Sequence, residues 1–99
     1  MPRIILPPED RDKFRFEIPR ARLPGATFDG ANMTDGDLRD ANLTNASFLG
    51  VNFLRTKLRG TILKGADLST AINLTPEQLA EAIIDENTKL PEGLKHAAE

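Results

Sequence analysis

A chain of 99 residues, with 28% charged and 39% hydrophobic side chains, has the size and composition of one globular domain. Its formal net charge of −2 argues against a general attraction to nucleic acid or to an anionic membrane. Because the chain has no cysteine, a disulfide framework, a thiolate metal site and a cysteine nucleophile are all excluded.

The N-terminal residues MPRIILPPED contain only a short apolar run, IIL, before two prolines. A signal-peptide core needs about 7–15 apolar residues, and a membrane span needs about 20. We therefore expect no membrane segment and a cytoplasmic location. Residues 1–20 are interpreted as an N-terminal arm and cap, in which Phe14, Phe16 and Ile18 close the first coil of the repeat that follows.

Residues 21–73 carry a repeat of five. A small or β-branched residue lies two positions before each large apolar residue, and Gly, Asp or Asn is frequent two positions after it, as is typical of turns. The large apolar residues are Leu23, Phe28, Met33, Leu38, Leu43, Phe48, Phe53, Leu58, Leu63 and Leu68.

Neither regular secondary structure accommodates a period of five. In an α-helix five residues rotate the side chain by about 140°, so the apolar positions would be spread around every face. In a strand an odd period sends successive apolar residues to opposite sides. A backbone that runs extended for three residues and then bends at a corner keeps every large apolar residue, and the small residue before it, on the inside.

The segments GANM, DANL, GVNF and GADL resemble the pentapeptide-repeat family, whose pattern is roughly A-(D/N)-L-x-x. This resemblance implies an all-β solenoid, a right-handed quadrilateral β-helix with four pentads in each coil of 20 residues. Residues 21–73 then make about 2.5–3 coils stacked at strand spacing.

A register of 20 predicts which side chains stack. In the core it places aromatic or aliphatic residues above one another, and on the outside it places mostly complementary charges together. The predicted pairs are Phe28 with Phe48, Asp35 with Arg55, Asp37 with Lys57 and, unfavourably, Arg39 with Arg59.

Residues 74–99 are interpreted as a C-terminal capping α-helix and tail. Thr75 is a predicted N-cap, Pro76 the first helical residue and Gln78 the partner of a capping box. We expect the helix to end near Asn87 and a following extended segment to place Leu90 and Leu94 against the body. The apolar stripe expected to cover the last coil is Leu79, Ala80, Ile83 and Ile84.

No residue is singled out as catalytic, cofactor-binding or metal-binding. The one histidine, His96, lies near the end of the chain without visible partners, and Ser47 and Ser69 have no histidine base. The recurring aspartates are interpreted as residues that form turns and bond the local backbone. They are Asp29, Asp35, Asp37, Asp40 and Asp67.

Two surface features stay open to more than one interpretation. Arg39, Arg55, Lys57 and Arg59 are expected to cluster, either as a solvated face offset by nearby aspartates or as a contact for an anionic partner. Leu49 and Leu54, on adjacent sides, are interpreted as covered by the N-terminal arm, as exposed by chance or as a partner site. Ile62 and Ile72 are also expected to face outward.

The sequence favours a non-catalytic structural or protein-interaction module of unknown partner, with no enzyme activity, no cofactor, no nucleic acid and a monomeric or weakly dimeric state. The alternative, implied by the resemblance, is a DNA-mimicking protein that binds gyrase. Residues 21–73 carry six Lys or Arg and five Asp or Glu. A mimic of duplex DNA needs about one negative charge per 1.7 Å, so this near neutrality argues against it.

Overall fold

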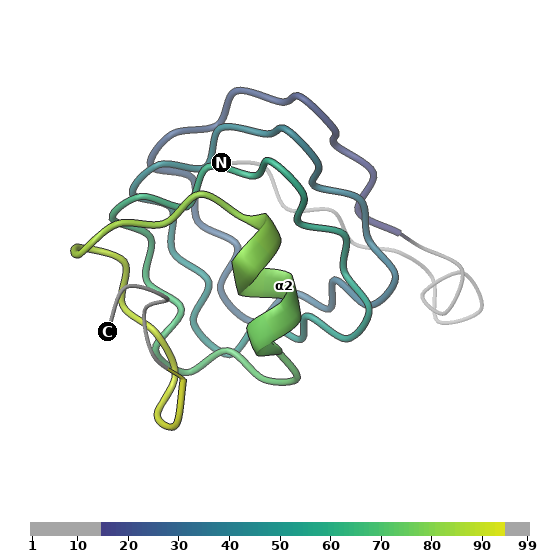
Figure 1. The fold of residues 1–99 in the computed structure, drawn as a ribbon. Helices are drawn as coiled ribbons and strands as arrows, with labels where there is room; N and C mark the ends of the chain where they lie inside the picture. Colours follow the sequence, from purple (N-terminus) through teal and green to yellow (C-terminus); the bar gives the residue numbers. More distant parts are fainter. Residues whose placement is uncertain (1–14, 95–99) are drawn as a thin grey trace.

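The computed structural model describes residues 15–94, whose backbone winds as stacked coils (Figure 1). Parallel β-bridges join outward residues that are 20 apart, so Glu17 pairs with Asp37 and Asp37 pairs with Lys57. The bridged residues recur every five positions, as at Glu17, Arg22, Thr27 and Asn32, which gives four sides to each coil. The predicted register of 20 is therefore confirmed from the first bridge to the pair Asn52 and Ile72.

The corners between sides are tight turns closed by a backbone hydrogen bond. The N–H of Ala41, for example, donates to the carbonyl of Leu38 at 3.1 Å. The residue before the closing N–H has a positive φ, 62° at Asp40 and 73° at Gly60. This left-handed conformation favours Gly, Asn and Asp, which explains why these residues recur at the corners of the repeat.

The large apolar residues of the repeat face inward, as predicted. The rings of Phe28 and Phe48 stack with their centroids 5.2 Å apart, and Phe53 packs against Phe48 at 5.4 Å. Leu23 and Phe28 are only partly buried. They lie in the first coil, which within the described residues has another coil on one side only. The fully buried members of the column are Met33, Leu38, Leu43, Phe48, Phe53, Leu58, Leu63 and Leu68.

Small residues two positions before the column complete the interior, and threonine replaces alanine at some of these positions. Each buried threonine hydroxyl donates to a carbonyl of the coil below, so no polar atom is buried without a partner there. The bonds run from Thr56 Oγ1 to Met33 O at 2.7 Å, from Thr61 Oγ1 to Leu38 O at 2.6 Å and from Thr88 Oγ1 to Leu63 O at 2.8 Å.

Helix α2 (Pro76–Glu81) lies across one end of the stacked coils (Figure 1). Its start is as predicted: Thr75 is the N-cap and accepts from the N–H of Gln78 at 3.1 Å, while Gln78 Oε1 accepts from the N–H of Thr75 at 2.8 Å. Leu79 is buried in the same apolar cluster as the column. Leu79 thereby connects α2 to the apolar column.

The predicted end of the helix near Asn87 is wrong, because α2 ends at Glu81. Residues 82–84 return to the extended pattern, and the N–H of Ile83 donates to the carbonyl of Thr61 at 2.8 Å. Ile83 therefore faces outward beside Ile62, with 42% of its surface exposed, instead of covering the core. Pairing with the free edge of the coil below satisfies backbone groups that a longer helix would leave open.

The predicted apolar stripe is correct in part. Leu79 is buried and Ile84 packs against the core, whereas Ala80 is exposed. Beyond the helix, Lys89 pairs with Asp67, and Leu90 and Leu94 pack against the core as expected.

The beginning of the described chain also contacts the column. Phe16 and Ile18 are partly buried against the core, and the ring of Phe16 meets Phe28 edge-on at 6.3 Å. The expectations for Phe14, for the covering arm and for His96 lie outside the described residues. Within residues 15–94 the model contains no helix of the length and apolar character needed to cross a membrane.

Candidate functional site

A groove of about 460 Å³ lies between α2 and the side of the coil that contains Thr56, Lys57 and the corner at Arg59. Four basic residues that the sequence analysis expected to cluster all contribute to its wall. The groove is lined by Arg39, Leu54, Arg55, Thr56, Lys57, Arg59, Asn73, Thr75, Gln78 and Glu81.

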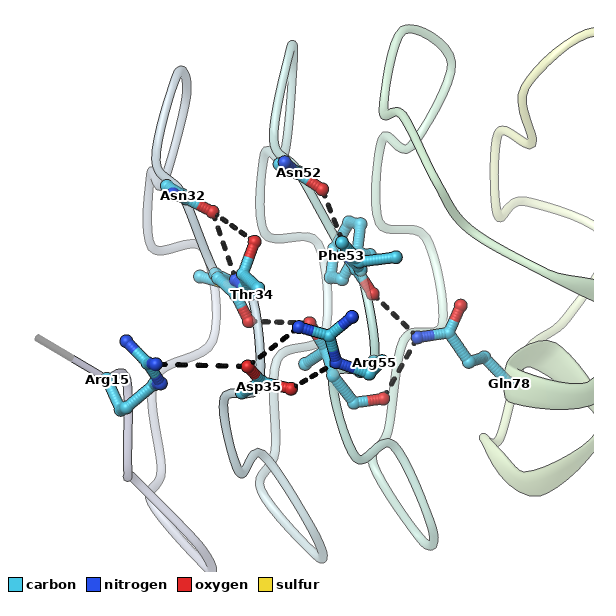
Figure 2. A network of polar contacts seen from close by, with 11 residues as sticks. Arg15, Asn32, Thr34, Asp35, Asn52, Phe53, Arg55 and Gln78 are labelled. Atoms are coloured by element: carbon cyan, nitrogen blue, oxygen red, sulfur yellow. Dashed lines mark hydrogen bonds and ion pairs between the residues drawn. The ribbon is translucent and has the colours of Figure 1, made fainter. Parts of the chain in front are cut away.

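The groove exists because α2 replaces one side of the next coil. Where a further coil is present, each side donates backbone N–H groups to the coil below, as Lys57 N–H does to Gly36 O at 2.9 Å. Above Thr56, the side-chain amide of Gln78 takes over this role. Its Nε2 donates to Phe53 O at 2.8 Å and to Thr56 O at 2.9 Å (Figure 2).

Backbone donors on the same edge are left without protein partners. In the coil below, Asp35 N–H donates to Leu54 O at 2.9 Å and Leu38 N–H donates to Lys57 O at 3.0 Å. The equivalent N–H groups of Arg55 and Leu58 have no acceptor among residues 15–94. The carbonyls of Phe53 and Thr56 on this edge already accept from Gln78, whereas the N–H groups of Arg55 and Leu58 stay open among the described residues.

One of the predicted outer charge pairs forms at the wall of the groove. Arg55 binds Asp35 through two bonds, Nε to Oδ1 at 2.6 Å and the second nitrogen to Oδ2 at 3.0 Å, and Arg15 lies 3.9 Å from the same carboxylate (Figure 2). The hydrogen bond from Arg55 is the main reason that the pKa of Asp35 is lowered, and the same bond raises the pKa of Arg55.

The other predicted pair, Asp37 with Lys57, does not form an ion pair within 4 Å. Asp37 instead binds the guanidinium of Arg39 through two bonds of 2.8 Å and accepts from the Arg39 N–H at 3.1 Å. These bonds lower the pKa of Asp37 to about 2. Arg39 binds Asp37 in preference to Lys57 because it offers a planar guanidinium with two donors and, in addition, its backbone N–H.

The groove therefore contains both satisfied and unsatisfied charges. Arg39 and Arg55 are neutralised by their carboxylate partners. Within the described part of the chain, Lys57 and Arg59 have no carboxylate within 4 Å. Glu81, on the helical wall, has no cationic side chain within 4 Å among the same residues.

The predicted bonds from aspartates to the local backbone form at Asp37 and Asp67, which accept from the N–H groups of Arg39 and Ser69. Two serine hydroxyls also bond aspartates, one across neighbouring coils and one within the same turn. Ser47 Oγ donates to Asp29 at 2.6 Å, and Ser69 Oγ donates to Asp67 at 2.7 Å. The bonds from the Ser69 hydroxyl and N–H lower the pKa of Asp67. No cluster of three His, Cys, Asp or Glu side chains suited to a metal ion occurs between residues 15 and 94.

Asp85, which sequence reasoning did not single out, closes the corner that follows α2. Its carboxylate accepts from the N–H groups of Gly65 at 3.1 Å and Asn87 at 3.0 Å, and from the hydroxyl of Thr88 at 3.2 Å. Burial raises the pKa of Asp85, but these bonds together outweigh it and the net pKa is lowered. The signal in the sequence is a D-x-x-T spacing of the kind that forms local side-chain bonds.

The exposed apolar residues do not form one continuous surface feature of the groove. Leu54 is 38% exposed and lines the groove, whereas Leu49, equally exposed, does not line it. Ile72, which pairs with Asn52, is 52% exposed. Only Leu54 thus adds an apolar contact to the basic cluster.

The pentapeptide-repeat model matches this chain in eight copies, over residues 20–48 and 37–72. Together these segments span 53 of the 99 residues, and the chain belongs to the pentapeptide-repeat family. No curated protein matches the chain.

Two solved structures of pentapeptide-repeat proteins are similar to it. One, from Nostoc PCC 7120, is 25% identical, and the alignment covers 88% of this chain and 84% of that one with a TM-score of 0.31. The other, from the thylakoid lumen of Arabidopsis thaliana, is 22% identical, with 76% of this chain and 51% of that one covered and a TM-score of 0.28. Both TM-scores are too low for these structures to bear on the groove.

Proposed function

We propose that this protein is a non-catalytic protein-interaction module whose partner binds the outer surface of the coil. The observation that carries this proposal is the groove beside α2, which combines cations without an ion pair among residues 15–94 and backbone N–H groups without an acceptor among the same residues. Ser47 donates to Asp29 of the neighbouring coil and Ser69 donates to Asp67, so these side chains take part in structural bonds.

We further infer that the coil is a right-handed quadrilateral β-helix and that α2 is its C-terminal cap. The burial of Leu79 against the column and the two bonds of Gln78 to the coil support a capping role. Stacked repeats need such end caps, because an uncovered last coil exposes its apolar interior. Truncation after Asn73 is expected to cause melting or aggregation, and a truncated chain as stable as the full one would contradict this inference.

The interaction proposal is tested by affinity capture from the source cell with the full chain as bait, followed by cross-linking to locate the contact. A partner cross-linked to the outer residues of the coil is the expected result. Detection of substrate turnover that depends on one specific side chain would instead replace the proposal with an enzyme. A cytoplasmic location and a monomeric or weakly dimeric state complete the proposal, and cell fractionation and analytical ultracentrifugation test them.

A further inference from the structure

We propose that the groove beside α2 binds an acidic segment of the partner protein, with carboxylates of that segment held by Lys57 and Arg59. This inference rests on the proposed function, because it names the chemistry of the partner at the same surface. It is carried by three independent features of the groove: its charges, its backbone donors and its size.

The charge of the groove favours an anion. Arg39 and Arg55 are each held by a two-pronged bond to an aspartate of their own surface, so their charge is largely balanced. Lys57 and Arg59 are exposed and, within residues 15–94, have no ion pair.

The backbone of the groove selects an acceptor. The N–H of Arg55, a residue of the groove wall, has no acceptor among the described residues. The carbonyls of Phe53 and Thr56 are occupied by Gln78. A strand added to this edge would need both donors and acceptors, whereas a carboxylate only accepts. The edge therefore suits carboxylate side chains better than an added β-strand.

The size and lining of the groove favour a peptide over a single small anion. Its volume of about 460 Å³ is far larger than the share of about 30 Å³ that one water molecule takes in the liquid. Leu54 supplies an apolar contact beside the cations, and Asn73, whose Nδ2 donates to Asn52 Oδ1 at 3.0 Å, lines the same groove. A segment that alternates carboxylate and apolar side chains uses all of these groups.

Glu81 limits which ligands are accepted. It lines the groove where its carbonyl accepts from the N–H of Gly60 at 2.8 Å, next to Arg59, and it has no ion pair within the described part of the chain. A carboxylate that enters the groove is repelled by Glu81 and attracted by Lys57 and Arg59. Removing the charge of Glu81 is therefore expected to strengthen the binding of an acidic segment.

The test uses the full chain and a fluorescein-labelled octapeptide that alternates glutamate with leucine, followed by fluorescence anisotropy at low salt. Double substitution, Lys57→Gln with Arg59→Gln, is expected to weaken binding about tenfold, at roughly two- to fivefold for each charge. Glu81→Gln is expected to tighten it about two- to fivefold. The matched control is Lys64→Gln, which removes an exposed lysine outside the groove and is expected to change binding less than about twofold.

Several results would overturn the proposal. They are equal binding of a peptide with glutamine in place of glutamate, an equal effect of the control substitution, and competition by inorganic phosphate as strong as that by unlabelled acidic peptide. Thermal melts establish that each variant is folded. If the double variant does not fold, Lys57→Gln alone, with an expected loss of about two- to fivefold, takes its place.

The outcome separates this inference from the proposed function. If a cellular partner is captured equally by the wild type and by the double variant, the acidic-segment proposal fails while the interaction module stands. If the acidic peptide binds the wild type, is lost in the double variant and competes with the captured partner, both stand. If no cellular protein and no acidic peptide binds, both fail.

Discussion

Replacing Gln78 tests whether one side-chain amide substitutes for a missing side of the β-structure. Its Nε2 donates to the carbonyls of Phe53 and Thr56, and its Oε1 accepts from the N–H of Thr75. A typical hydrogen bond contributes about 0.5–1.5 kcal/mol net, so the two bonds to the coil are worth about 1–3 kcal/mol. Loss of the capping-box bond adds about 0.5–1 kcal/mol. Gln78→Ala is therefore expected to lower the free energy of unfolding by about 1.5–4 kcal/mol.

Gln78→Glu separates the two roles of this side chain. Glutamate keeps an acceptor for the N–H of Thr75 but, when ionised, has no donor for Phe53 O or Thr56 O. It places negative charge against two carbonyl oxygens, so a loss of at least about 2 kcal/mol is expected at pH 7. The same carbonyls are expected to raise the pKa of the introduced carboxyl group. Its protonation restores one donor, and the loss relative to the wild type is expected to shrink between pH 7 and pH 4.

Urea unfolding at pH 7 and at pH 4, with the wild type measured at each pH, provides the assay. Glu77→Ala, on the exposed face of the same helix, is the matched control and is expected to cost no more than about 1 kcal/mol. If Gln78→Glu were as stable as the wild type at pH 7, the side-chain amide of Gln78 would not be replacing the backbone donors of a missing side of the coil. An unchanged difference between the two pH values would also contradict the reasoning.

Two other substitutions test the corners and the outer charges. Gly60→Ala is expected to destabilise more than Gly50→Ala in thermal melts: both have positive φ, which costs about 1–2 kcal/mol, but only at Gly60 does a new methyl group meet the carboxylate of Asp40. Equal losses would show that Asp40 moves away freely. The pKa of Asp37 is about 2 in the folded protein against an ordinary 3.8, so its bond to Arg39 stabilises fully above about pH 4 and is lost as the pH falls toward 2. Asp37→Asn is expected to remove that part of the acid dependence. The effect is about 1 kcal/mol or less because the pair is partly exposed. An unchanged pH profile of the melting temperature would contradict this prediction.

The core could be predicted from the sequence because a strict repeat leaves little choice. Once Phe28 is placed inside, a register of 20 puts Phe48 next to it and fixes the faces of every residue between them. The stacked rings of this pair confirm that inference. Each pentad indicates in the same way which residue faces inward, so the prediction rests on the whole repeat and not on one contact.

The end of the helix could not be predicted in the same way. The spacing of Leu79, Ile83 and Ile84 suits an amphipathic helix, and the local pattern alone favours continuing it. The free edge of the coil below competes for the same backbone, and the bond from Ile83 N–H to Thr61 O is visible only in three dimensions. Tertiary pairing overrides the helical period here.

The candidate site was predicted in part. The register brought Lys57 and Arg59 to one surface, but the choice of Asp37 between Lys57 and Arg39 depends on side-chain geometry that the pattern does not contain. Glu81 and the role of Gln78 were missed because both follow from where α2 crosses the coil.

The spacing between paired residues increases at the end of the molecule. It is 20 as far as Ile72, then 21 between Ile62 and Ile83 and 22 between Asp67 and Lys89. A β-edge recruits another chain most readily when its donors and acceptors are evenly spaced. An edge with uneven steps and a helix in place of one side is a poor template for another copy of the repeat. We therefore expect the irregular last coil to oppose end-to-end stacking of copies into fibres. Any protein built from identical layers is exposed to such stacking.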